Sequence, residues 1–83
     1  MKTLTQYGSL ALEHWKQFLP RMVEELERKG ALQELLLEAE RKTTSELDDL
    51  RQHFRQQGLT AEQAHHRAWE VVRARYIFLP PEP

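Results

Sequence analysis

The chain has 83 residues, a net charge of −1 at pH 7 and no cysteine. It can therefore form neither a disulfide nor a thiolate metal site, and no apolar stretch approaches the ~20 residues that span a bilayer. We expect one cytoplasmic helical domain over residues 1–79, a short extended proline-rich tail over 80–83, and a core so small that self-association would help to stabilise it.

The first helix is predicted from apolar residues that recur at spacings of three and four and so share one helical face. They are Leu4, Tyr7, Ala11, Trp15 and Phe18, with Thr3 or Thr5 available as the N-terminal cap. Pro20 lacks an amide hydrogen, so this helix should kink or split there. A short second helix should follow, with Met22, Val23 and Leu26 inward, and should end at Gly30.

The clearest pattern predicts one continuous long helix over about 31–57. Its apolar seam consists of Leu32, Leu36, Ala39, Thr43, Leu47, Leu50 and Phe54, widened by Leu35. Gly58 can adopt the left-handed backbone conformation that ends a helix, and Thr60 with Gln63 forms a capping box for the next one.

The last helix is expected from about 61 to 77, with Ala64, Ala68, Val71, Val72 and Tyr76 inward. A short connection makes neighbouring helices antiparallel. The sequence therefore predicts an all-α fold, a small antiparallel bundle of three main helices whose first member is kinked or split at Pro20.

Four apolar residues in a row, Tyr76 to Leu79, should not lie exposed on a monomer. They should either fold back on the first helices and close the core, or dock on a second copy or another protein. The residues expected in such an interface are Trp15, Leu36, Leu47, Leu50, Phe54, Trp69, Tyr76 and Phe78.

Charge is unevenly distributed, with an acidic excess over residues 21–50 and a basic excess over residues 51–76. The favoured interpretation is that the two segments lie antiparallel and complement each other. The alternative is that a C-terminal arginine face binds nucleic-acid phosphates. The candidates for that face are Arg51, Arg55, Arg67, Arg73 and Arg75.

Glu62 precedes His65 by three residues and His66 by four, a spacing that could present metal ligands on one helical face. A complete carboxylate-histidine site would need two copies of the chain. We favour instead a solvated helix end, where an acidic residue suits the helix dipole. No nucleophile context and no glycine-rich phosphate loop is present, so the sequence predicts no catalytic residue, no cofactor, no small-molecule substrate and no enzyme.

Two segments, "YGSLALEHWKQFLPRMVEELERKGALQELL" at 7–36 and "RAWEVVRARYIF" at 67–78, resemble small transposon-encoded helical proteins of the TnpV type. This resemblance implies a bacterial mobile-element or accessory role and carries no catalytic motif. The leading hypothesis is a non-enzymatic, self-associating helical interaction protein, with no membrane partner. A nucleic-acid-associated accessory protein is second, and a dimeric metal protein is third.

Overall fold

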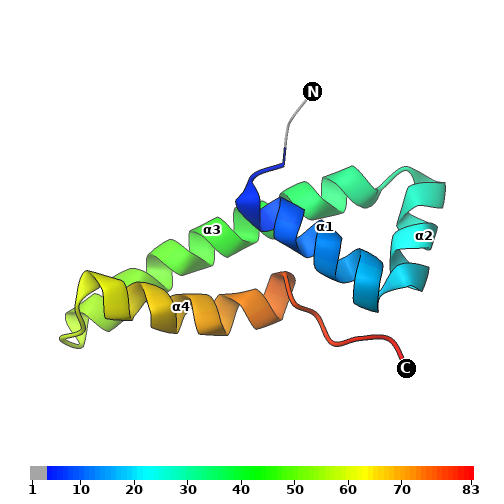
Figure 1. Cartoon of the computed structure of the whole chain (residues 1–83). Coiled ribbons are helices and arrows are strands. Elements are labelled where there is room, and N and C mark those ends of the chain that lie inside the picture. The colour runs from blue at the N-terminus through cyan, green and yellow to red at the C-terminus, as the bar shows by residue number, and fades with distance from the viewer. Residues whose placement is uncertain (1–3) are drawn as a thin grey trace.

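The computed structural model describes residues 4–83, and these form four α-helices packed together with no β-strand (Figure 1). The helices are α1 (Gln6–Phe18), α2 (Pro20–Lys29), α3 (Leu32–Gln56) and α4 (Ala61–Tyr76). The predicted all-α class is confirmed. The chain splits at Pro20, so the segment expected to form the first main helix consists of two separate helices.

Leu19 separates α1 from α2. Its backbone lies at φ −131° and ψ 50°, outside the helical region, because the following proline disfavours a helical conformation at the residue before it. Pro20 then occupies the first turn of α2, where its missing amide hydrogen costs no helical hydrogen bond. α2 turns away from α1 and leads to the start of α3 (Figure 1). It ends at Gly30, whose φ of 69° is readily adopted only without a Cβ.

α3 is one unbroken helix of 25 residues. Its predicted seam is largely buried, since Leu36, Ala39, Thr43 and Leu47 are all inaccessible to solvent or nearly so. Phe54 is only half-buried. It lies near the C-terminal end of α3, which α1 does not reach (Figure 1). The prediction that Leu35 widens the seam is wrong, because 36% of its surface is exposed.

The turn between α3 and α4 follows the predicted local signals. Gly58 has φ 98°. The Thr60 hydroxyl accepts a hydrogen bond from the Gln63 amide at 3.2 Å, and the Gln63 side chain accepts one from the Thr60 amide at 3.0 Å. α4 then returns beside α3 (Figure 1). Its buried residues are Ala64, Ala68 and Val72; Val71, expected inward, is 37% exposed because the buried positions recur every four residues.

A carboxylate from α3 fixes the start of α1. Glu40, only 7% exposed, accepts hydrogen bonds from the Thr5 amide, from the Thr5 hydroxyl at 2.6 Å and from the Gly8 amide at 3.1 Å. The first amides of a helix lack partners within it and carry partial positive charge, so a carboxylate is well suited to them. The Thr5 side chain makes no capping bond within α1, contrary to its predicted role, and Thr3 lies outside the described residues.

The segment after α4 folds back on α1 and α2, as the first of the two tail predictions stated. Ile77 is fully buried, and its carbonyl accepts a hydrogen bond from the Trp15 indole at 3.0 Å. Farther along, the Glu82 amide donates to the Phe18 carbonyl at 3.0 Å, and its carboxylate accepts from the Arg21 amide at 2.9 Å. The tail therefore ties the α1–α2 junction to the end of α4 (Figure 1).

The buried core has two parts. The larger lies among α1, α2, α3 and Ile77, and the smaller consists of Leu47, Ala68 and Val72 between α3 and α4. The principal dimensions are 46 × 33 × 14 Å and the radius of gyration is 14.3 Å. A domain of this length has a radius of gyration near 12 Å, so the molecule is elongated and thin. No helix in residues 4–83 combines the length and apolarity needed to cross a membrane.

Candidate interaction surface

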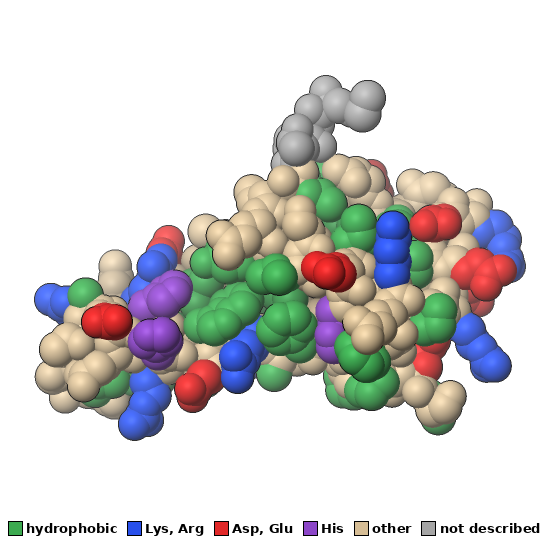
Figure 2. Space-filling view, viewed as in Figure 1, with side chains coloured by type: hydrophobic (Ala, Val, Ile, Leu, Met, Phe, Trp, Pro, Cys, Tyr) green, Lys and Arg blue, Asp and Glu red, His purple; other side chains and the backbone are tan. Residues whose placement is uncertain are grey.

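Five ring side chains form a continuous row on one face of the molecule, here called the aromatic row. In order they are Tyr7, Trp69, Phe78, His14 and Phe18, with successive ring centroids 5.4, 6.2, 5.2 and 4.6 Å apart. None is fully buried, and Phe18 is 39% exposed. Figure 2 shows hydrophobic side chains gathered on this face over α1 and α4, with histidines at one end of the patch.

Three separate parts of the chain bring these rings together. Tyr7, His14 and Phe18 are seven and four residues apart and so lie along one side of α1. Trp69 comes from α4, and Phe78 follows the end of that helix. His14 Nε2 also lies 2.8 Å from the Leu79 carbonyl oxygen, which holds the tail segment, and with it Phe78, against α1.

Aromatic side chains such as those of the aromatic row are enriched in protein-binding surfaces. Each aromatic contact contributes about 0.5–1.5 kcal/mol beyond the area that it buries, so neighbouring rings hold one another in place. Side chains that are already ordered lose little conformational entropy when a partner binds. Tyrosine and tryptophan also dominate the binding energy of many interfaces.

Charged groups lie at different points along the row. A groove of about 520 Å3 contacts Tyr7, Trp69 and Phe78 and also includes His65 and Arg73. A smaller groove of about 170 Å3 lies beside His14 and Phe78 and includes Glu13. Within residues 4–83, neither Arg73 nor Glu13 forms an ion pair. Arg73 thus lies in the groove beside Tyr7, Trp69 and Phe78, and Glu13 lies in the groove beside His14 and Phe78.

The predicted interface residues are distributed between the core and the surface. Trp15, Leu36 and Leu47 are each at most 2% exposed and belong to the core. Leu50 and Phe54 are half-buried in the α3–α4 contact. Of the eight predicted residues, Trp69 and Phe78 belong to the aromatic row.

Tyr76, also predicted at the interface, belongs to a different cluster. A hydrogen bond to Glu46, burial and the negative charge of Glu46 raise the pKa of Tyr76 above its ordinary value of 10.0, while the charge of Arg75 opposes this shift. Arg75 itself pairs with Glu46 at 2.6 Å, and the Lys42 ammonium lies 6.0 Å from the Tyr76 ring centroid. Tyr76 therefore stays neutral at physiological pH.

The sequence pattern placed Tyr7 and Phe18 on the buried face of α1. Tyr7 does pack against the core and is only partly exposed, whereas Phe18 is 39% exposed. The buried positions of α1 are Gly8, Ala11 and Trp15. Gly8 has no side chain, so a count of hydrophobic residues does not register its burial. The spacing of Tyr7, His14 and Phe18 was a usable signal, since it defines a second stripe beside the buried one.

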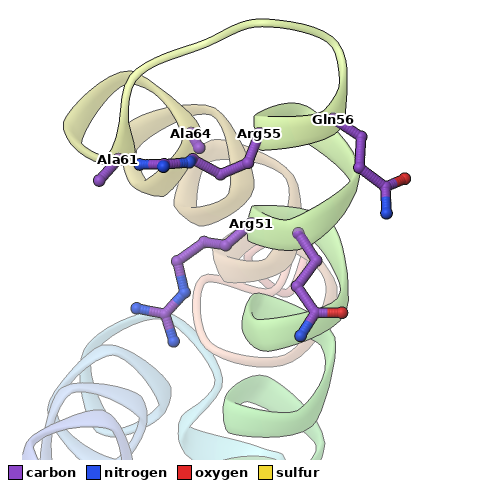
Figure 3. A pocket seen from close by; sticks show the side chains of 6 residues that line it. Arg51, Arg55, Gln56, Ala61 and Ala64 are labelled. Atoms are coloured by element: carbon purple, nitrogen blue, oxygen red, sulfur yellow. The ribbon is translucent and has the colours of Figure 1, made fainter.

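Of the five candidate arginines, Arg51 and Arg55 line one groove and Arg73 lines another. Arg51 and Arg55 line a groove of about 460 Å3 with Ala61 and Ala64 at the far end of α3 and α4 (Figure 3), and Arg51 also pairs with Asp48. Arg75 is paired with Glu46, and Arg73 lies at the aromatic row. Arg67 is exposed on α4.

The metal candidates are near one another in sequence without forming a ligand cluster in the single chain. Glu62 and His66 are exposed, and the ring centroids of His65 and His66 are 6.2 Å apart. Among residues 4–83, no three His, Asp or Glu side chains come together in a way that could hold a metal ion. His65 instead borders the groove beside the aromatic row.

Comparison with known proteins assigns no family to this all-helical chain. No family model matches it, and neither the curated proteins nor the solved structures include a significant match. The resemblance to TnpV-type proteins stays a prediction from the sequence.

Proposed function

We propose that this protein is a non-enzymatic interaction module that binds another copy of itself or a partner protein through the aromatic row. The observation that supports this most directly is the continuous contact of five rings on one face, none of them fully buried. Large apolar patches on soluble proteins commonly mark interaction sites. In this proposal the helices act as an antiparallel bundle of three main units, with α1 and α2 together forming the first.

The proposed role is that of a cytoplasmic accessory protein, and the resemblance to TnpV-type proteins suggests a mobile-element setting. Nucleic-acid binding is the second candidate, with Arg51 and Arg55 as its best-supported pair because they line one groove. It has less support than protein binding, since Arg75 is already paired with Glu46. The net charge of −1 also differs from the basic character usual for such domains.

Site-specific photocrosslinking in cells that produce the protein tests the proposed function. A photoreactive phenylalanine analogue replaces Phe18 in one variant and Val71 in the other. The two positions are matched in exposure, at 39% and 37%. Val71 lies two residues from Trp69, and a helix turns about 200° over two residues, so Val71 points away from the row.

We expect protein adducts, formed with another copy or with a different protein, from the Phe18 position and few from the Val71 position. Mass spectrometry of the adducts would identify the partner. Equal labelling from both positions, or no protein adduct from Phe18, would show that the aromatic row is not a protein-binding surface.

A further inference from the structure

We propose that the junction of α1 and α2 is a binding site for an extended peptide segment with a large apolar residue, two prolines and an acidic residue. The chain's own residues 79–83, here called the 79–83 segment, occupy this site until an equivalent segment of another protein displaces them. The site is additional to the proposed function and does not depend on it, because its ligand is a short peptide and not a folded surface.

One acidic residue satisfies both helix ends at the junction. The break at Leu19 and Pro20 leaves the last carbonyl of α1 and the first amides of α2 without helical partners. The Glu82 amide donates to the Phe18 carbonyl at 3.0 Å, and the Glu82 carboxylate accepts from the Arg21 amide at 2.9 Å. A ligand residue at this point therefore needs both a backbone amide and a carboxylate, which excludes proline and favours glutamate or aspartate.

The residues before Glu82 suit an extended bound peptide. His14 Nε2 lies 2.8 Å from the Leu79 carbonyl oxygen, and the Leu79 side chain packs against the core. Pro80 and Pro81 are exposed and connect these contacts to Glu82. Proline restricts the backbone of an unbound peptide, so less conformational entropy is lost when the peptide binds. A pair of prolines between an apolar residue and an acidic residue is therefore well suited to this site.

The 79–83 segment can leave its site while the helices stay folded. The Phe78 amide bonds the Arg73 carbonyl at 2.7 Å and Ile77 is fully buried, so the chain stays anchored as far as residue 78. Beyond that point, three of the five residues are exposed prolines. A segment with few buried contacts needs little free energy to open, so a competing peptide can take its place.

The 79–83 segment also leaves part of its site unfilled. A groove of about 170 Å3 lies beside Leu79 and includes the apolar side chains of Trp15, Leu35 and Ala39. The two cations in its lining already form ion pairs with carboxylates of α3, so its apolar part remains for a ligand. Leu35 is still 36% exposed. A ligand with tryptophan in place of Leu79 should therefore bury more apolar area and bind more tightly than the chain's own segment.

Rescue by a peptide added to the full chain tests this site. The chain is isotopically labelled, carries Glu82→Lys, and is followed by the NMR signal of the Arg21 amide, which has lost its carboxylate acceptor. Three unlabelled synthetic peptides of residues 79–83 are added, one with the native sequence, one with Leu79→Trp and one with Glu82→Lys. Glu24→Lys in the full chain is the matched control, because it makes the same charge change on α2 at a side chain that is 72% exposed.

We expect Glu82→Lys in the chain to shift the Arg21 signal by more than Glu24→Lys does, with an unchanged circular dichroism spectrum. The native peptide should return the signal to its wild-type position at millimolar concentration, and the Leu79→Trp peptide at about tenfold lower concentration. The Glu82→Lys peptide should not return it. In the wild-type chain, the Leu79→Trp peptide should release the Glu82 amide, but only at about tenfold higher concentration, because the chain's own segment competes.

Three results would overturn the inference. The first is an Arg21 signal that neither glutamate-containing peptide restores, which would mean that the junction binds no peptide from outside. The second is equal rescue by the Glu82→Lys peptide, because the site would then not recognise the carboxylate. The third is a Leu79→Trp peptide that shifts the signals of Tyr7 and Trp69 but not that of Arg21, which would place peptide binding at the aromatic row and leave the proposed function standing.

Discussion

At the scale of single residues, Gly8 and Glu40 depend on each other. A Cβ added at Gly8 would lie 2.7 Å from the Glu40 carboxyl carbon, closer than unbonded atoms approach. Alanine in an exposed helical position is more stable than glycine by up to about 1 kcal/mol. At position 8 the clash should exceed this gain, because Glu40 cannot move without leaving the amides of Thr5 and Gly8 unpaired.

We therefore expect Gly8→Ala to lower the free energy of unfolding by about 1–3 kcal/mol in urea denaturation. Ser9→Ala is the matched control, since Ser9 is exposed on the same helix and should change stability by less than about 0.5 kcal/mol. A stabilised Gly8→Ala variant would show that Glu40 does not constrain the start of α1.

At the scale of helices, local signals were sufficient to predict the boundaries, and long-range contacts were not predictable. Pro20 begins a helix, and Gly30 and Gly58 follow the ends of helices. These roles come from the backbone preferences of the residues themselves, so they can be predicted from the sequence. The burial of Glu40 is different, because a carboxylate usually lies in solvent and its partners are 32 and 35 residues away.

The candidate site illustrates the same limit. Trp69 and Phe78 were predicted at an interface because aromatic side chains are enriched there, but the sequence could not show that they meet α1. Trp69 contacts Tyr7 across 62 positions of sequence, and this pairing exists only once α4 has folded back beside α3. Likewise, Trp15 was predicted at the interface for its size, whereas its indole donates to the Ile77 carbonyl inside the core.

The tail contact with α2 gives an element-scale prediction. Glu82 bonds the Arg21 amide, so it caps α2 from outside, where the helix has no side-chain cap of its own. Glu82→Ala should lower the free energy of unfolding by about 1 kcal/mol, as loss of an N-terminal cap does. Thermal unfolding followed by circular dichroism measures this.

Glu24→Ala is the control for that measurement. Glu24 pairs with Arg28 on α2, but both side chains are at least 70% exposed, so their ion pair should contribute at most about 0.5 kcal/mol. Equal effects of Glu24→Ala and Glu82→Ala would show that the tail does not act as a cap.

At the scale of the whole molecule, stability should decrease along the α3–α4 pair. The end of the pair that holds the start of α3 and the end of α4 packs against α1, α2 and the tail. The smaller core cluster, farther along α3, has only Leu47, Ala68 and Val72 as its buried members. Beyond it, Phe54 is half-buried, and Arg51 and Arg55 border an open groove. Fewer buried apolar contacts mean that less free energy is needed to open the backbone there.

Native-state amide hydrogen exchange should therefore show faster exchange at residues 52–56 and 65–67 than at 36–47, apart from the first amides of each helix. A partner bound at the aromatic row should not remove this gradient, because the row runs over α1 and the later part of α4 and leaves the groove at Arg51 uncovered. Uniform protection along α3 would mean that the far end is covered too, and the partner would then have to be sought at Arg51 and Arg55 rather than at Phe78.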